Sequence, residues 1–275
     1  MITLPYTEII DVTSEYNHFE YSLFIRLPND YHSNGKSYPT LFLLDPESLL
    51  LMCYNIKKIY EHHIIVGIGH KDLDFKVLEG TVRRHKNDIN RTRDFLPWKL
   101  DKKVFKEGTT DAVANEIVDA SGYAQQFAQF ITHQVIPLVD KTFRTTTERT
   151  LVGHSFGGVF ASFMLLFYPD FFTKYIMITP VLHEAYYQQK DMFDGMEKKV
   201  PTTKKLAYFS IGGEEKDDGV VNNYIGTLKK SCLAIGALQH IVSKVEVIEQ
   251  ESHVSVVTPS IWRGMGFFDV HNQQE

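Results

Sequence analysis

The segment LVGHSFGGVF (Leu151–Phe160) places Ser155 between two glycines, after an apolar pair and before an apolar run. The pattern Gly-x-Ser-x-Gly is typical of a sharp turn from a strand into a helix, which lifts the serine hydroxyl above the carboxyl edge of a sheet. Gly153 and Gly157 would let the two backbones approach closely, and Ser155 would hold a strained conformation. The segment therefore predicts a nucleophilic serine. The alternative is a small residue that only fills a tight turn.

Short apolar runs bounded by turn residues surround this segment, as buried strands of a parallel sheet would be. We expect strands at 40–45, 63–69, 175–180 and 206–212, a strand that ends at 151–152, and a more alternating edge strand at 244–250. Two antiparallel strands, 8–14 and 21–28, precede them, and helical patterns lie at 47–60, 123–143 and 155–168. Strands that alternate with helices indicate an α/β fold with a mostly parallel central sheet and helices on both faces.

The length of 275 residues suits one domain, and the sequence shows no internal repeat. Residues 70–122 form a long, polar and charged stretch that interrupts the alternation of strands and helices. Structured stretches of this kind inside a compact domain tend to serve a function. We therefore expect a single domain over 1–275, with 70–122 as an inserted loop or cap region near the site.

The net charge of −5 is mild and spread along the chain, which disfavours nucleic acid or an anionic membrane as a partner. No apolar run approaches the roughly 18–20 residues that span a bilayer. The N-terminus lacks the pattern of a secretory signal, so a cytoplasmic protein is the expectation. Cys53 and Cys232 lack Cys-x-x-Cys spacing and predict neither a disulfide framework nor a thiolate zinc site.

The sequence offers no pattern for a metal or a nucleotide cofactor. The histidines between residues 62 and 85 form no His-Glu-x-x-His motif, and the adjacent pair would face opposite sides of a strand. A structural role for these histidines is therefore the expectation. The chain also lacks a Gly-x-Gly-x-x-Gly motif and a phosphate-binding loop.

A serine hydroxyl is a weak nucleophile and needs an imidazole to accept its proton. In enzymes whose serine lies in such a turn from strand to helix, the order along the chain is nucleophile, acid and histidine, and the histidine lies in the loop after the final strand. His253 lies three residues beyond the expected strand 244–250, with Ser252 and Ser255 as small polar neighbours. We expect His253 to be the general base. The alternative is an exposed loop histidine.

The acid should follow the preceding strand, 206–212, and hold the imidazole in its productive tautomer. The next residues, GEEKDDG, supply four candidates, Glu214, Glu215, Asp217 and Asp218. We favour Glu215, with Glu214 or Asp217 as alternatives. If the turn is only acidic and solvated, a Ser-His dyad remains.

Backbone N–H groups should stabilise the oxyanion that forms when the serine attacks a carbonyl group. One should belong to Phe156, the residue after the nucleophile. The second should come from the loop after strand 40–45. Pro46 has no N–H group, so Glu47 is the expected donor and Asp45 the alternative.

Several stretches together resemble the Putative esterase family of α/β-hydrolases, which includes siderophore esterases, esterase D-like serine hydrolases such as S-formylglutathione hydrolase, feruloyl esterases and mycolyltransferases. The stretches are TLFLLDPE, RTRDFLP, LVGHSFGG, LAYFSIGGEE and ESHVSVVTPSIWRGMGFF, which span about residues 40–268. RTRDFLP and the terminal His-x-Ser stretch are most similar to the siderophore-esterase branch. The resemblance implies an α/β-hydrolase fold, with Ser155 as nucleophile, His253 as base, and the N–H groups of Phe156 and Glu47 in the oxyanion hole.

Two departures from the family's pattern concern the oxyanion hole and the substrate. Pro46 stands where the family has a glycine, so the stretch reads LLDP in place of LLDG. After the strand 175–180 the chain reads TPVLHEAYY, without the paired tryptophans of the siderophore branch. His183 and Tyr186 would then line a pocket of a different shape.

Arg91 and Arg93, in NRTRDFLP, are candidate substrate-binding residues. An arginine here could clamp a carboxylate or a catecholate of the substrate. The alternative, which we favour, is a structural pairing with Asp94 that holds the loop.

These features predict a serine esterase that hydrolyses a carboxylic ester through an acyl-enzyme on Ser155. The expected partner is a small-molecule ester, siderophore-type or other, with no cofactor, and the oligomeric state stays open. An acyltransferase or thioesterase of the same fold is one alternative. A catalytically silent binding module is another, but it would have no need to retain nucleophile, acid and histidine together.

Overall fold

A computed structural model of the chain describes residues 7–46, 49–50, 53, 55–71, 80–102, 110–182, 199–215 and 223–272. Within residues 80–85 it describes the backbone only. No helix in these ranges is long and apolar enough to cross a membrane.

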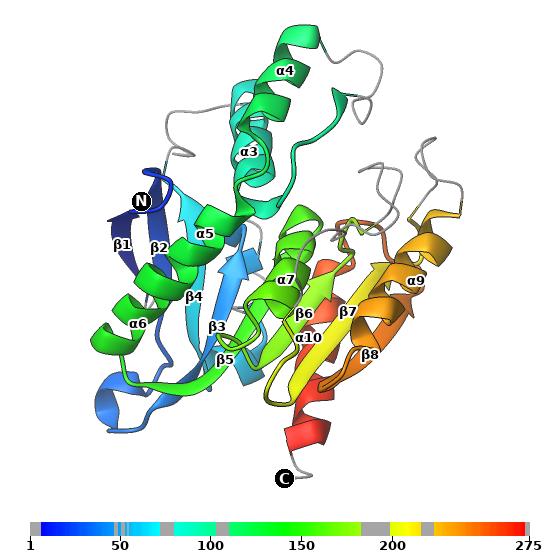
Figure 1. Cartoon of the computed structure of the whole chain (residues 1–275). Coiled ribbons are helices and arrows are strands. Elements are labelled where there is room, and N and C mark those ends of the chain that lie inside the picture. Colours follow the sequence, from blue (N-terminus) through cyan, green and yellow to red (C-terminus); the bar gives the residue numbers. More distant parts are fainter. Residues whose placement is uncertain are drawn as a thin grey trace.

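Eight strands among the described residues form one sheet at the centre of the molecule (Figure 1). Their spatial order is β1-β2-β4-β3-β5-β6-β7-β8, with antiparallel pairing from β1 to β4 and parallel pairing from β4 to β8. The strands are β1 (Thr7–Thr13), β2 (Glu20–Arg26), β3 (Tyr38–Leu44), β4 (Ile64–His70), β5 (Thr145–His154), β6 (Lys174–Ile178), β7 (Lys205–Gly212) and β8 (Ile241–Ile248). The predicted mostly parallel sheet, with its last strand at an edge, is confirmed.

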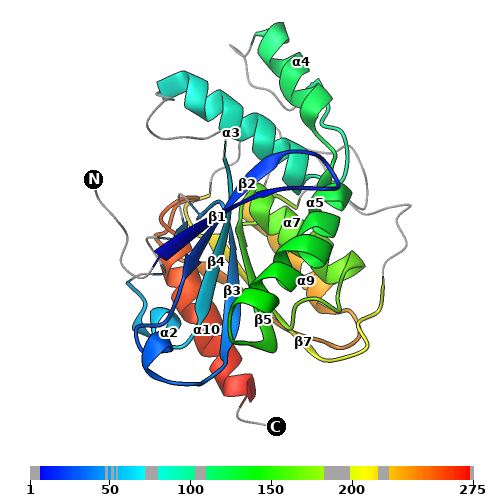
Figure 2. The same cartoon turned by 90° about the vertical axis from the view of Figure 1, so that its left-hand side faces the viewer.

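Helices cover the sheet on both faces, as predicted (Figures 1 and 2). They are α2 (Lys57–Tyr60), α3 (Gly80–Phe95), α4 (Asp111–Ala120), α5 (Ala124–Phe130), the π-helical η3 (Ile131–Val135), α6 (Ile136–Thr142), α7 (Phe156–Phe167), α9 (Tyr224–Gly236) and α10 (Val257–Asn272), with a 3-10 turn, η1 (Tyr31–Ser33). α5, α6, α7 and α9 lie on one face, and α2 and α10 lie on the other. Each face encloses its own hydrophobic core.

The central strands have continuous apolar sequences because helices bury them on both sides. Every residue of β4 (IIVGIGH), β6 (KYIMI) and β7 (KLAYFSIG) is buried. β1 lies at an edge of the sheet, and none of its residues is fully buried. The apolar runs in the sequence therefore correspond to the interior of the sheet.

The helical region before β4 differs from the single helix expected over 47–60. Asn55 lies in a turn and Ile56 is extended, with φ −103° and ψ 96°, so α2 begins only at Lys57. Asparagine favours turns because its side chain bonds to nearby backbone groups. The helix expected over 123–143 does form, as α5, η3 and α6 in succession.

The described part of residues 70–122 lies beyond the carboxyl ends of the parallel strands (Figures 1 and 2). α3 and α4 pack against each other there, and α3 also contacts α5 and α7. α3 therefore borders the edge of the sheet at which β5 turns into α7.

A buried carboxylate, Asp94, joins α3 to the sheet. Its Oδ2 accepts hydrogen bonds from the Tyr21 hydroxyl (2.7 Å) and from His70 Nε2 (2.8 Å), while Arg93 donates to both oxygens (2.8 and 2.9 Å). Burial opposes ionisation of Asp94, but the bonds from His70 and Arg93 hold its pKa below the usual value. This carboxylate therefore ties β2 and β4 to α3.

We expect Asp94→Asn to lower the free energy of unfolding by about 3–5 kcal/mol, because it leaves the buried Arg93 without its counter-ion. Asp11→Asn is the control: Asp11 is half exposed and pairs with Lys71 at 3.2 Å on the surface, so its loss should cost less than about 1 kcal/mol. Urea unfolding of both variants measures the difference. Equal losses would contradict the role given to Asp94.

Candidate active site

Ser155 occupies the turn between β5, which ends at His154, and α7, which begins at Phe156. Its backbone has φ 58° and ψ −119°, a conformation that residues with a side chain rarely adopt. The Ser155 N–H donates to the carbonyl of Ile178 on β6 at 2.9 Å. A Cβ atom on Gly153 would overlap the carbonyl oxygen of Gly157, so a glycine is needed where strand and helix meet.

This turn directs polar groups toward a cavity of about 210 Å³. The residues that line it are Asp45, Leu49, Asn87, Arg91, His154, Ser155 and His253. Phe156 is the first residue of α7, and the N–H groups of a first helical turn have no partner within the helix. The partial positive charge of that helix end favours negative charge beside Ser155.

His253 and Glu215 lie side by side in the turns that follow β8 and β7. Nδ1 of His253 is 2.9 Å from Oε1 and 3.2 Å from Oε2 of Glu215. The Glu215 side chain is 7% exposed and that of His253 is 38% exposed. Because an ionised carboxylate can only accept, Nδ1 is the donor of this bond, and in the neutral imidazole Nε2 is then the acceptor.

The other acidic candidates do not take this position within the described residues. Glu214 is exposed, and its N–H donates to the carbonyl of Glu251 at 2.9 Å. Asp217 and Asp218 lie outside the described residues. Glu215 is therefore the described carboxylate that contacts the histidine.

Arg91 faces the cavity of Ser155, but its partner is not the expected one. Nε donates to Asp45 Oδ1 at 3.0 Å, and one terminal nitrogen donates to the carbonyl of His154 at 3.2 Å. Asp45, considered above only as an oxyanion donor, has a positive φ of 55° and lines the same cavity. The guanidinium of Arg91 therefore joins the end of β3 to the turn that holds Ser155.

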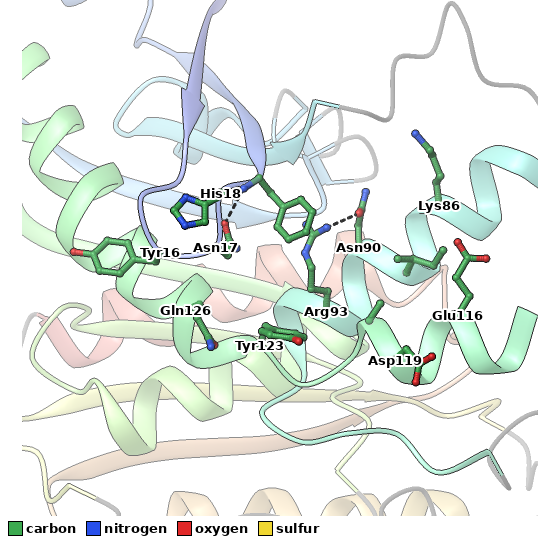
Figure 3. Close-up of a pocket in the computed structure, with 13 residues that line it drawn as sticks. Tyr16, Asn17, His18, Lys86, Asn90, Arg93, Glu116, Asp119, Tyr123 and Gln126 are labelled. Carbon is green, nitrogen blue, oxygen red and sulfur yellow. Dashed lines mark hydrogen bonds between the residues drawn. The ribbon is translucent and has the colours of Figure 1, made fainter.

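Arg93 points to the opposite side of α3. It pairs with Asp94, as the favoured alternative expected, and lines a second cavity of about 580 Å³ (Figure 3). Its guanidinium donates to Asn90 Oδ1 at 3.0 Å and lies 3.6 Å from the ring centroid of Phe19. Arg93 is thus held by Asp94, Asn90 and Phe19, beside a cavity that Ser155 does not line.

Three of the expected site residues, Glu47, His183 and Tyr186, lie outside the described residues. Two polar residues that the sequence did not single out, Asn87 and His154, line the cavity. Asn87 precedes Arg91 by one helical turn, a spacing that places both on one face of α3. Its buried Oδ1 has no hydrogen-bond partner among the described residues.

Known proteins resemble this chain in sequence and in structure. The model of the family Esterase, described as "Putative esterase", matches residues 92–233. The chain is 24% identical to the ferri-bacillibactin esterase BesA of Bacillus subtilis, over 96% of this chain and 90% of BesA.

Among solved structures, the BES protein from Bacillus cereus matches with a TM-score of 0.74 at 23% identity, covering 97% of each chain. The siderophore hydrolase EstB from Aspergillus nidulans matches with a TM-score of 0.69 at 20% identity, over 98% of this chain and 96% of EstB. With the sheet described above, these likenesses show that the chain has the α/β-hydrolase fold.

We expect Gly153→Ala to lower the free energy of unfolding by about 3 kcal/mol or more, because the added methyl group would overlap the backbone of Gly157 in the first turn of α7. Gly266→Ala is the control, since a Cβ on this glycine of α10 would meet nothing within 4 Å. It should stabilise the helix by up to about 1 kcal/mol. Urea unfolding compares the two variants. A Gly153→Ala protein as stable as the wild type would refute the close contact between the end of β5 and the start of α7.

Proposed function

Because this chain belongs to the Putative esterase family and is a carboxylic ester hydrolase, we propose that it cleaves its substrate through an acyl-enzyme on Ser155. The observation that carries the proposal is the pair of His253 and Glu215, with Nδ1 2.9 Å from Oε1, beside the cavity that Ser155 also lines. A base with its orienting acid on the same cavity as a serine is the arrangement that activates a hydroxyl.

The proposed reaction has two halves. Ser155 Oγ attacks the ester carbonyl carbon while Nε2 of His253 takes the hydroxyl proton, and the tetrahedral intermediate collapses as His253 gives that proton to the leaving alcohol oxygen. A water molecule then attacks the acyl carbon and loses a proton to the same nitrogen. Collapse of the second intermediate releases the acid and returns the proton to Ser155.

Glu215 serves this cycle by holding one tautomer of His253. With Nδ1–H donated to the carboxylate, Nε2 is the acceptor that serine needs, and the negative charge stabilises the imidazolium. The Glu215 side chain is almost fully buried, which strengthens that interaction.

The oxyanion would be held by two backbone N–H groups. We assign one to Phe156, whose N–H belongs to the first turn of the 12-residue helix α7. The second belongs to the segment after β3, with Glu47 as the expected donor and Asp45 as the alternative. The position of Asp45 on the same cavity supports a donor from this segment.

For the substrate we propose an ester of the siderophore type. The names of BesA and EstB describe hydrolases of siderophores, and the polar cavity beside Ser155 suits an oxygen-rich ligand. Of the two arginines we assign substrate contact to Arg91, because Arg93 lines the other cavity. His183 and Tyr186 would complete the pocket.

We also propose that residues 1–275 act as one domain, in which 70–122 form a cap beside the site. Asn87 and Arg91 of α3 contribute to the cavity of Ser155, which supports a role of this region in substrate binding.

A fluorophosphonate probe tests the nucleophile. Wild-type protein should be labelled on Ser155 and should hydrolyse p-nitrophenyl esters, whereas Ser155→Ala should lose labelling and roughly 10⁴-fold or more in kcat. Ser162→Ala, in the same helix, should keep both properties. Absence of labelling in folded wild-type protein would instead favour the silent binding module.

The acid is tested by comparing neighbouring glutamates. Glu215→Gln should lower kcat by about 10²- to 10⁴-fold, because the amide no longer stabilises the imidazolium. Glu214→Gln should stay within about twofold, since that side chain is exposed. Steady-state kinetics of both variants measure kcat. An unchanged kcat in Glu215→Gln would mean that Ser155 and His253 act as a dyad without an acid.

A further inference from the structure

His154, the residue before Ser155, carries a partly buried imidazole that the proposed reaction does not use. Its Nε2 is 2.7 Å from the backbone carbonyl oxygen of His253. The two imidazole rings also touch, with centroids 4.8 Å apart and planes tilted by 47°. The contact spans 99 positions in the sequence and joins the end of β5 to the turn after β8.

The chemistry of the two groups fixes the direction of this hydrogen bond. A carbonyl oxygen can only accept, so Nε2 of His154 carries a proton and donates it. Burial, together with the neighbouring His253 and Arg91, lowers the pKa of His154 to about 3. His154 is therefore a neutral imidazole at neutral pH, with one defined tautomer.

His154 is itself held in place on its main chain. Its carbonyl accepts a hydrogen bond from Arg91 at 3.2 Å, and the next residue, Ser155, donates its N–H to Ile178 at 2.9 Å. The turn that carries His253 is held by a local bond, Ser252 N–H to Ser255 Oγ at 2.9 Å, and by the bond from Glu214 N–H to the carbonyl of Glu251 at 2.9 Å. The bond from His154 adds a direct contact between the carbonyl of His253 itself and the fixed junction of β5 and α7.

We propose that His154 is a positioning residue that holds the backbone of His253 within reach of Ser155. The inference rests on the proposed function. Glu215 fixes the orientation of the His253 imidazole through Nδ1, and His154 fixes the position of the His253 backbone. Because a displacement of about 1 Å at a reacting group can cost roughly 10²-fold in rate, loss of this bond should slow the reaction and leave binding almost unchanged.

The test compares two amides that differ by one methylene. In His154→Gln the amide nitrogen reaches about the position of Nε2 and can donate to the carbonyl of His253, whereas in His154→Asn it falls short. We expect His154→Asn to lose about 10- to 100-fold in kcat with KM within about threefold, and His154→Gln to recover most of the loss. Titration of active sites with a fluorophosphonate corrects kcat for unfolded protein.

A double-mutant cycle with Glu215→Gln gives the second readout. If His154 and Glu215 act through the same imidazole, their effects on kcat are non-additive, and His154→Asn costs less in the Glu215→Gln background. Equal kcat in wild type and His154→Asn, equal losses in the Asn and Gln variants, or strict additivity would each overturn the proposal. Failure of the proposed function looks different, because wild-type protein would then not label on Ser155.

Discussion

The backbone of Ser155 is the constraint on which the site depends. A non-glycine residue with φ 58° costs on the order of 1–3 kcal/mol and persists only where the surroundings over-determine it. Here α7 supplies that support, because every residue from Gly157 to Phe167 is buried and the helix cannot shift without opening the core. The bond from the Ser155 N–H to Ile178 fixes the other side of the turn. The apolar burial of one helix thus maintains the strained conformation that places Ser155 on the cavity.

A second constraint fixes α3, the helix that contributes Asn87 and Arg91 to the wall of the cavity. Arg91 and Arg93 are two residues apart, about 200° around a helix, so they cannot face the same side. Arg93 pairs with Asp94, and this buried ion pair anchors the helix to β2 and β4. Arg91 is thereby directed at Asp45 and at the carbonyl of His154. The anchoring of one arginine sets the direction of the other.

The sequence alone could predict the order of strands and helices, the turn at Ser155 and the separate loops that carry His253 and the acidic run. It favoured Glu215 but left Glu214 and Asp217 open, because the choice depends on how the turns after β7 and β8 meet. It also gave no sign of Asn87 or His154. The helical spacing of Asn87 and Arg91 would have pointed to a shared face once a helix was assumed over that region.

What the sequence by itself determined is therefore local: apolar runs make buried strands, glycines permit the close turn, and chain order assigns one loop to each chemical group. Tertiary structure decided which side chains pair, over separations of 38 residues for Glu215 and His253, 46 for Asp45 and Arg91, and 99 for His154 and His253. The physical reason is that periodicity and turn chemistry act between neighbours. A hydrogen bond between distant residues exists only after the sheet has brought the carboxyl ends of its strands to one edge.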